Sequence, residues 1–208
     1  MADEFVLARL LGDIERKRVL ELGCGDGSRA VELARRGANV IAVDPSTEAG
    51  LATRKRAETA EVRIELRTGD LADLAFLRGD SVDVAFAEGS LASLTDLGRV
   101  LRQVQRVLRA GAWFAFSLPH PVTACVASEP EPDGSLPLAR PYVERSYFDD
   151  DVPHGAAVHP HRIADVFALL GRVGFRVDTI LEPEPPATAR GRALLPDTVI
   201  WRARKVGS

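Results

Sequence analysis

Cysteine is scarce in this sequence, and its scarcity narrows the class of protein. Only Cys24 and Cys125 occur in 208 residues, which is too few for the disulfide framework of a small secreted domain. The hydrophobic share of 46% is ordinary and supplies a buried core in a chain of this length. We therefore expect a single domain over residues 1–208 that folds in a reducing cytoplasm.

Long apolar runs and an excess of basic residues are missing too. No run approaches the length of a membrane span, and the first four residues lack the basic start of a signal peptide. Lys and Arg number 27 against 30 Asp and Glu, so the net charge is −3 and no basic field favours nucleic acid or anionic lipid. The composition thus predicts a cytoplasmic protein whose partner is a small molecule, with neither membrane nor nucleic acid involved.

Short apolar stretches alternate with amphipathic stretches over the first 118 residues. Strands are predicted at 19–22, 40–43, 62–66, 82–86 and 113–118, and helical periodicity occurs at 28–36, 46–56, 71–77 and 97–108. Strands that alternate with helices form a mostly parallel sheet covered on both faces. The fold class is therefore α/β, a Rossmann-like doubly wound sheet.

The alternation stops after the fifth predicted strand. Eight prolines lie between Pro119 and Pro160, and we expect residues 121–160 to form an inserted lid or substrate-binding segment. A helix is predicted from about 161, followed by strands at 175–181 and 197–205 with no helical period between them. The last two strands are thus predicted to form an antiparallel hairpin at the edge of a seven-stranded sheet.

A glycine-rich turn follows the first predicted strand. Gly23, Gly25 and Gly27 have the spacing G-x-G-x-G, which lets a ligand approach the backbone amides at a helix start. The dinucleotide fingerprint G-x-G-x-x-G would need Gly or Ala where Ser28 stands. Glu21, two residues upstream, would repel a pyrophosphate but attract an ammonium or sulfonium group. The turn therefore favours S-adenosylmethionine, and a dinucleotide-binding oxidoreductase stays as the alternative.

Acidic residues also end the next two predicted strands. Asp44 lies 21 positions after Gly23, where an acid reaches the hydroxyls of an adenosine ribose. Asp70, within Gly69-Asp70-Leu71, can accept a hydrogen bond from the adenine amino group while Leu71 packs on the ring. Each acid alone also fits a simple turn cap, but the ordered series favours an adenosine site.

The run VLELGCGDG…VIAVDPS…RTGDL…SVDVAFAEGSL…LRQVQRVLRAGAWFAFSLPHP resembles the class I S-adenosylmethionine-dependent methyltransferases in their broad small-molecule branch, over residues 18–120. The resemblance implies a seven-stranded sheet whose last strand is antiparallel. The later region is similar to a bacterial, commonly actinobacterial, subgroup. The cofactor-binding residues implied are Glu21, Gly23, Cys24, Gly25, Asp44, Pro45, Gly69, Asp70, Leu71, Ala87 and Glu88.

The acceptor side is less defined. His120 and His161 are candidates for a general base, because a histidine pKa lies near working pH; a capping or solvent-exposed role is the competing interpretation. Tyr142, Tyr147 and Phe148 in the inserted segment are candidate substrate-binding residues. No matching Cys or acidic cluster accompanies the histidines, so no metal is expected.

About 17 residues precede the first predicted strand, fewer than the family usually has. Either the site is more open, or it is covered by the inserted segment and by a partner subunit in a homodimer. A non-catalytic cofactor-binding module is the third interpretation. The acceptor atom, whether oxygen, nitrogen or carbon, is not specified by these motifs.

Overall fold

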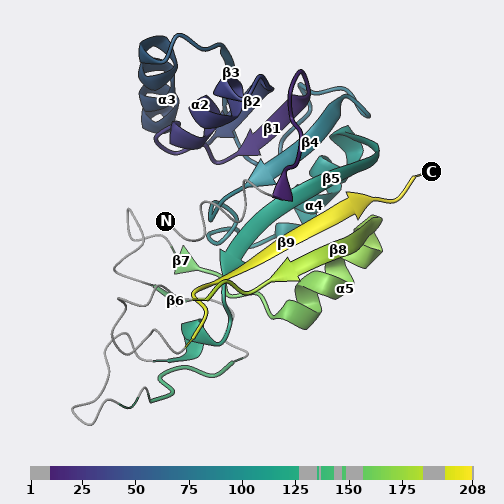
Figure 1. Ribbon diagram of the computed structural model, residues 1–208. Helices are drawn as coiled ribbons and strands as arrows, with labels where there is room; N and C mark the ends of the chain where they lie inside the picture. The colour runs from purple at the N-terminus through teal and green to yellow at the C-terminus, as the bar shows by residue number, and fades with distance from the viewer. Residues whose placement is uncertain are drawn as a thin grey trace.

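The computed structural model describes residues 10–126, 135, 137–142, 147–148, 157–184 and 195–207. Its centre is a seven-stranded sheet with the order β3-β2-β1-β4-β5-β9-β8 (Figure 1). The strands are β1 (Arg18–Leu22), β2 (Asn39–Asp44), β3 (Ile64–Thr68), β4 (Val82–Ala87), β5 (Leu108–Pro119), β8 (Phe175–Leu181) and β9 (Thr198–Lys205). All pairings among β1 to β5 are parallel, which confirms the α/β Rossmann-like prediction.

Within the described residues, four α-helices cover the sheet. They are α2 (Ser28–Arg35), α3 (Thr47–Thr59), α4 (Leu97–Val107) and α5 (Ile163–Val173). Helix α2 contributes to one buried cluster and α4 and α5 to another, so the two clusters fill opposite faces of the sheet. Figure 1 shows α2 and α3 together beside β1–β3, and α4 and α5 beside β4, β5 and β8.

Helix α4 has the apolar spacing and the capping residue expected of a helix that packs on the sheet. Val100, Leu101, Val104 and Val107 recur at three and four residues, and all are fully buried against the sheet. The Asp96 side chain caps the helix by accepting a 2.9 Å hydrogen bond from the Arg99 amide. Apolar spacing and cap therefore agree on the same helix start.

The hairpin predicted at the sheet edge is present. Strand β9 is antiparallel to both β5 and β8, and it lies between them. Trp201 of β9 is fully buried and stacks on Phe116 of β5, with ring centroids 6.2 Å apart. This aromatic contact helps to anchor the hairpin on the parallel part of the sheet.

The helix predicted at 71–77 and the predicted start of the fifth strand were wrong, and the third strand lies at 64–68 rather than 62–66. Residues 71–77 form turns rather than a helix, because the Asp70 side chain accepts from the Ala72 amide at 2.8 Å and so favours a turn. Strand β5 begins at Leu108 instead of residue 113. Gly111, with a φ of 75°, lies inside it near a register shift between β4 and β5 and does not end the helix.

The proline-rich segment is described only in part. It includes the one-turn helix η1 (Thr123–Cys125) and the antiparallel pair β6 (Tyr147–Phe148) and β7 (Ala157–Val158). Most of the predicted lid over 121–160 lies outside the described residues, as do the side chains of Tyr147 and Phe148. Among the helices that the structure describes, none is both long and apolar enough to cross a membrane.

Candidate cofactor site

The glycine turn that follows β1 is packed against the loop after β4. Gly23 has a φ of 78°, and its amide donates a 2.7 Å hydrogen bond to the Val43 carbonyl of β2. A Cβ placed on Gly23 would lie 2.1 Å from the Ser90 Cβ, far inside van der Waals contact. Gly25 differs, because nothing lies within 4 Å of the corresponding position. The turn thus needs a glycine at 23 for packing and leaves open space at 25.

Cys24 points away from this open space. Its side chain is buried, and the Thr53 hydroxyl of α3 contacts its Sγ atom at 3.3 Å. Burial raises the pKa of the Cys24 thiol to about 11. A thiol that stays protonated is a poor nucleophile, so the environment of Cys24 fits a packing role.

Glu21 is a buried acid at the carboxyl end of β1. Its side chain is 2% exposed, and its Oε2 atom has no hydrogen-bond partner among the described residues. Burial raises its pKa to about 8; the charge of Arg29 acts against this shift, and Glu88, Asp44 and Asp26 add to it. An unsatisfied buried oxygen is costly, and a bound ammonium group would satisfy it. This residue therefore fits the amino end of the expected cofactor.

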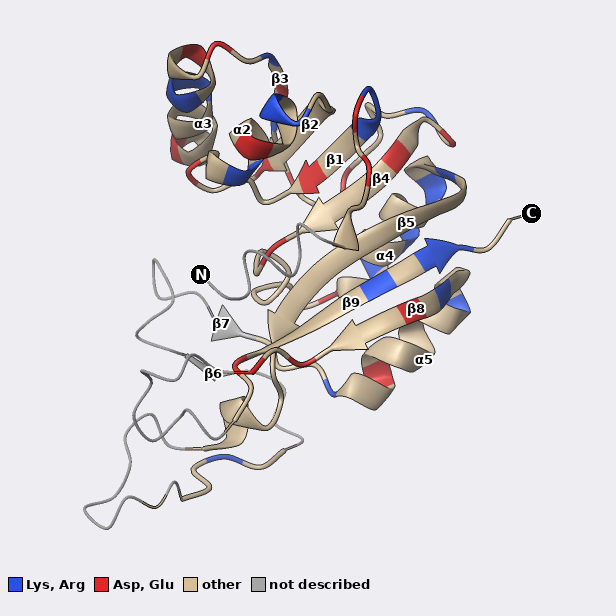
Figure 2. Cartoon of the chain, in the orientation of Figure 1, with Lys and Arg blue, Asp and Glu red and all other residues tan. Residues whose placement is uncertain are grey.

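Asp44 at the end of β2 is held in a fixed orientation. One carboxylate oxygen accepts from the Gly25 amide at 3.0 Å, and the other accepts from the Ser46 amide at 2.8 Å. Each carboxylate oxygen has further acceptor capacity, which suits the two hydroxyls of a ribose. Figure 2 shows acidic residues at the carboxyl end of β1 and in the nearby turns.

A cavity of about 450 Å³ lies at these strand ends. Its volume is within the range of small-molecule sites. Six of its lining residues were predicted from the sequence: Gly23, Asp44, Pro45, Gly69, Asp70 and Leu71. Three were missed, namely Ser90, Ser93 and Leu94. They lie two to six residues beyond the pair predicted after the fourth strand, and no motif pointed to them.

The loop after β4 is tied to its neighbours by specific contacts. The Ser90 hydroxyl donates a 2.5 Å hydrogen bond to the Leu22 carbonyl, and the Gly89 amide donates to the Ser117 hydroxyl at 2.9 Å. Glu88 accepts from the Arg29 guanidinium. The side chain of Ala87 is fully buried in the core, so only its backbone can face a ligand.

The two candidate bases have different surroundings. His120 is 5% exposed; its Nδ1 accepts from the Val122 amide at 3.3 Å and its Nε2 lies 3.0 Å from a Glu182 oxygen. His161 is partly buried, and its Nε2 atom has no hydrogen-bond partner among the described residues. Burial, with a smaller effect of His159, lowers the pKa of His161 below 6.5. Of these two candidates, only His161 thus has a ring nitrogen without a protein partner among the described residues, and that nitrogen is buried.

The chain segment that carries His161 lies beside the loop after β4. The His159 amide donates a 2.8 Å hydrogen bond to the Ala92 carbonyl, two residues from Ser90 of the cavity. Tyr142, a candidate substrate-binding residue of the inserted segment, is 45% exposed. No described group of three or more His, Cys, Asp and Glu side chains is arranged to hold a metal ion.

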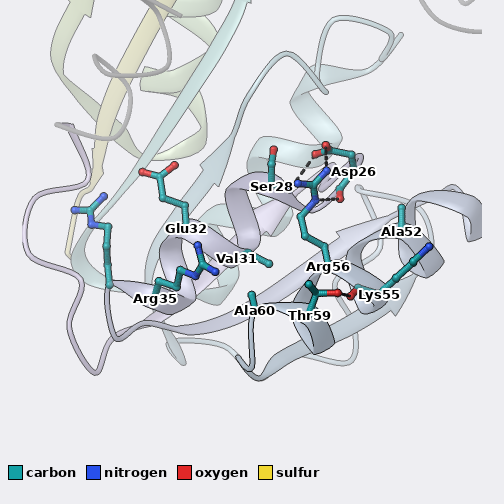
Figure 3. Close-up of a pocket in the computed structure, with 11 residues that line it drawn as sticks. Asp26, Ser28, Val31, Glu32, Arg35, Ala52, Lys55, Arg56, Thr59 and Ala60 are labelled. Atoms are coloured by element: carbon teal, nitrogen blue, oxygen red, sulfur yellow. Dashed lines mark hydrogen bonds and ion pairs between the residues drawn. The ribbon is translucent and has the colours of Figure 1, made fainter.

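A larger hollow, of about 740 Å³, lies elsewhere, between α2 and α3 (Figure 3). Arg35, Lys55 and Arg56 line it and are exposed, and Arg56 pairs with Asp26 at 2.6 Å. None of the residues predicted to bind cofactor lines it. Its long charged side chains are typical of solvated helix faces, so the smaller cavity is the better cofactor site.

Comparison with known proteins gives the family that this sequence resembles. Residues 20–116 match the family described as methyltransferase domain. A ubiquinone biosynthesis O-methyltransferase of Azorhizobium caulinodans is 34% identical over 96 residues, which cover 46% of this chain and 38% of that protein. A magnesium-protoporphyrin O-methyltransferase of Rhodobacter capsulatus is 38% identical over 100 residues, covering 48% of this chain and 44% of that protein. The chain therefore spans less than half the length of these relatives.

The similarity to solved structures covers more of the chain than the similarity in sequence does. A crystal structure of an S-adenosylmethionine-dependent methyltransferase from Mesorhizobium loti has a TM-score of 0.84 and 26% identity, covering 99% of this chain and 98% of that one. The curated relatives come from proteobacteria, so the actinobacterial placement stays a prediction. Residues 20–116 thus resemble a methyltransferase domain in sequence, and the chain shares its fold with an S-adenosylmethionine-dependent methyltransferase over nearly its whole length.

Proposed function

We propose that this protein transfers a methyl group from S-adenosylmethionine to a small-molecule acceptor. The observation that carries the proposal is the arrangement at the carboxyl ends of β1, β2 and β3. Asp44 and Asp70 line one cavity with Gly23, and the buried Glu21 precedes that glycine by two residues. Ligands of open α/β sheets bind at this edge, beyond the strand ends.

Each acid has a separate role in this proposal. Glu21 offers its unsatisfied oxygen to the ammonium group, and Asp44 accepts from the ribose hydroxyls. Asp70 is oriented by the Ala72 amide and accepts from the adenine amino group beside Leu71. The bound cofactor supplies an electrophilic methyl group on a sulfonium. The protein then mainly has to position the acceptor and exclude water.

We propose His161 as the group that takes a proton from the acceptor, where the acceptor must lose one. Its lowered pKa keeps the imidazole neutral at pH 7, and its Nε2 atom is free to accept among the described residues. His120 instead has both ring nitrogens engaged by Val122 and Glu182, so we assign it a structural role. The sequence analysis named both histidines as candidates, and this proposal keeps only His161 as the base.

An activity screen tests the proposal directly. The purified protein is incubated with S-adenosylmethionine and a panel of small hydroxyl, amine and carbon acceptors, and S-adenosylhomocysteine is measured. We expect acceptor-dependent formation of S-adenosylhomocysteine, lowered in the His161→Gln variant. Binding of S-adenosylhomocysteine without turnover on any acceptor would favour the non-catalytic module.

We also propose that the protein works in the cytoplasm. Both cysteines are buried, reduced thiols, which agrees with a reducing compartment. A homodimer, and a lid formed by residues 121–160, stay as predictions from the sequence. Light scattering of the purified chain tests the homodimer.

A further inference from the structure

Arg29 lies in the first turn of α2, two residues after Gly27 of the glycine turn. It has no role in the function proposed so far. Its side chain is 11% exposed. Its Nε atom lies 3.0 Å from one oxygen of Glu88, its Nη2 lies 3.4 Å from the other, and its Nη1 donates to Glu32. A guanidinium that engages both oxygens of one carboxylate fixes its orientation more firmly than a single contact does.

The contact joins two parts of the candidate cofactor site. Arg29 belongs to α2, whereas Glu88 follows β4 and is adjacent to the Gly89-Ser90 pair that packs on Gly23. The Glu88 side chain is 34% exposed, whereas its partner Arg29 is 11% exposed, so a partly exposed carboxylate is held by a nearly buried guanidinium. Among the residues that the structure describes, Arg29 is the hydrogen-bond partner that holds the Glu88 carboxylate against α2.

Arg29 also acts on Glu21. The charged groups that face the Glu21 carboxyl come from several elements: Arg29 from α2, Glu88 from the loop after β4, Asp44 from β2 and Asp26 from the glycine turn. Three of these four groups are acids and oppose ionisation of Glu21, while Arg29 favours it. The ionised form is the one that attracts an ammonium group.

We propose that Arg29 is a positioning residue of the cofactor site, which holds the Glu88 carboxylate in place and supplies the positive charge that faces the buried Glu21 carboxyl. The proposal rests on the proposed function, since the benefit of an ionised Glu21 is the binding of a cationic group. Arg29 itself is engaged by Glu88 and Glu32, so we assign it no direct contact with the cofactor.

The test measures the free energy of unfolding against pH without any ligand. An acid whose pKa is raised from 4.5 to about 8 on folding makes stability fall as pH rises between these values and level off above 8. The contribution of Glu21 is isolated as the difference between each protein and the same protein carrying Glu21→Gln. The proteins compared are the wild type, Arg29→Gln, Glu88→Gln and Arg35→Gln.

The Arg29 and Glu88 variants are expected to shift, in opposite directions, the pH at which the contribution of Glu21 to stability levels off. Arg29→Gln removes a positive charge near Glu21, so the levelling-off point moves upward by about 1 pH unit. Glu88→Gln removes a negative charge and moves it downward. Arg35→Gln is the matched control, because it removes the same charge from the exposed end of the same helix and should leave the point unchanged. General destabilisation cannot produce shifts of opposite sign.

Affinity for S-adenosylhomocysteine gives the second readout. At pH 7 we expect Arg29→Gln to bind about tenfold more weakly than Arg35→Gln, because less Glu21 is ionised. Equal pH profiles for these two variants would overturn the proposal, as would a failure of Glu88→Gln to shift downward. If Arg29→Gln does not fold, Arg29→Met replaces it and should show the same upward shift, whereas Arg29→Lys keeps the positive charge and should keep the wild-type profile. The unfolding experiment needs no cofactor, so its outcome is separate from any failure of the proposed function.

Discussion

Ser90 packs on Gly23 so closely that a Cβ placed on the glycine would lie 2.1 Å from the Ser90 Cβ. The same serine donates a 2.5 Å hydrogen bond to the Leu22 carbonyl. One side chain from the loop after β4 therefore fixes the position of the glycine turn after β1. The two loops that border the cofactor cavity form one packed unit.

Gly23→Ala should be strongly destabilising. Steric overlap and a φ of 78° together should lower the free energy of unfolding by about 3 kcal/mol, measured by urea denaturation. Gly25→Ala is the control, because its Cβ meets nothing within 4 Å and only the backbone cost of about 1 kcal/mol applies. The double variant Gly23→Ala/Ser90→Gly removes the overlapping atoms and should be more stable than the sum of the single changes predicts. Simple additivity would contradict the packing described here.

Glu21 should make cofactor binding depend on pH. A bound ammonium group favours the ionised carboxyl, so affinity for S-adenosylhomocysteine should rise by up to about tenfold per pH unit below pH 8, and binding should release protons. Calorimetry in buffers of different ionisation enthalpy measures both effects. Glu21→Gln should bind more weakly and lose the proton release attributable to this residue. Identical proton release in wild type and variant would show that Glu21 stays in one protonation state.

Asp44→Asn should weaken S-adenosylhomocysteine binding by about 10- to 100-fold, because the charged acceptor of the ribose hydroxyls is lost. Asp26→Asn serves as the matched control. Asp26 lies in the glycine turn that Asp44 contacts through the Gly25 amide, but it is exposed and pairs with Arg56, so its replacement should change affinity by less than about threefold. Similar losses in both variants would place the ribose elsewhere.

His161 should leave a signature in the pH dependence of methyl transfer. Its pKa lies below 6.5, so the neutral, proton-accepting form is already dominant at pH 7 and the rate should fall only as the pH drops below 6.5. His161→Gln should lower kcat with little change in the KM for the cofactor, and it should remove this acidic limb. His120→Gln should instead lower stability, because it disrupts the contacts with Val122 and Glu182. An unchanged acidic limb in the His161 variant would rule out this role.

Six residues that line the candidate cofactor cavity were predictable because their signals in the sequence are local. The glycine spacing around Gly23 and the acids that end β1 and β2 follow directly from the strand boundaries, and Asp44 and Asp70 both line the cavity. Parallel strands bring their carboxyl ends to one edge, so residues far apart in sequence meet there. The fold was predictable for the same reason, since each strand and helix carried its own periodicity.

Contacts between loops were not predictable. Ser90, Ser93 and Leu94 line the cavity because the loop after β4 turns back over Gly23, and no short-range pattern encodes that turn. Side-chain capping by Asp70 replaced the helix expected at 71–77 with turns. The pairing of Arg29 with Glu88 spans 59 residues, so it became visible only when α2 and β4 were placed together.

The central claim is that the cavity beside Gly23 binds S-adenosylmethionine. Isothermal titration calorimetry of the wild-type chain with S-adenosylhomocysteine and, separately, with NAD tests it most directly. We expect saturable binding of S-adenosylhomocysteine at one site per chain, weakened by Asp44→Asn, and no measurable binding of NAD. Binding of NAD alone would contradict the claim and favour a dinucleotide-binding oxidoreductase.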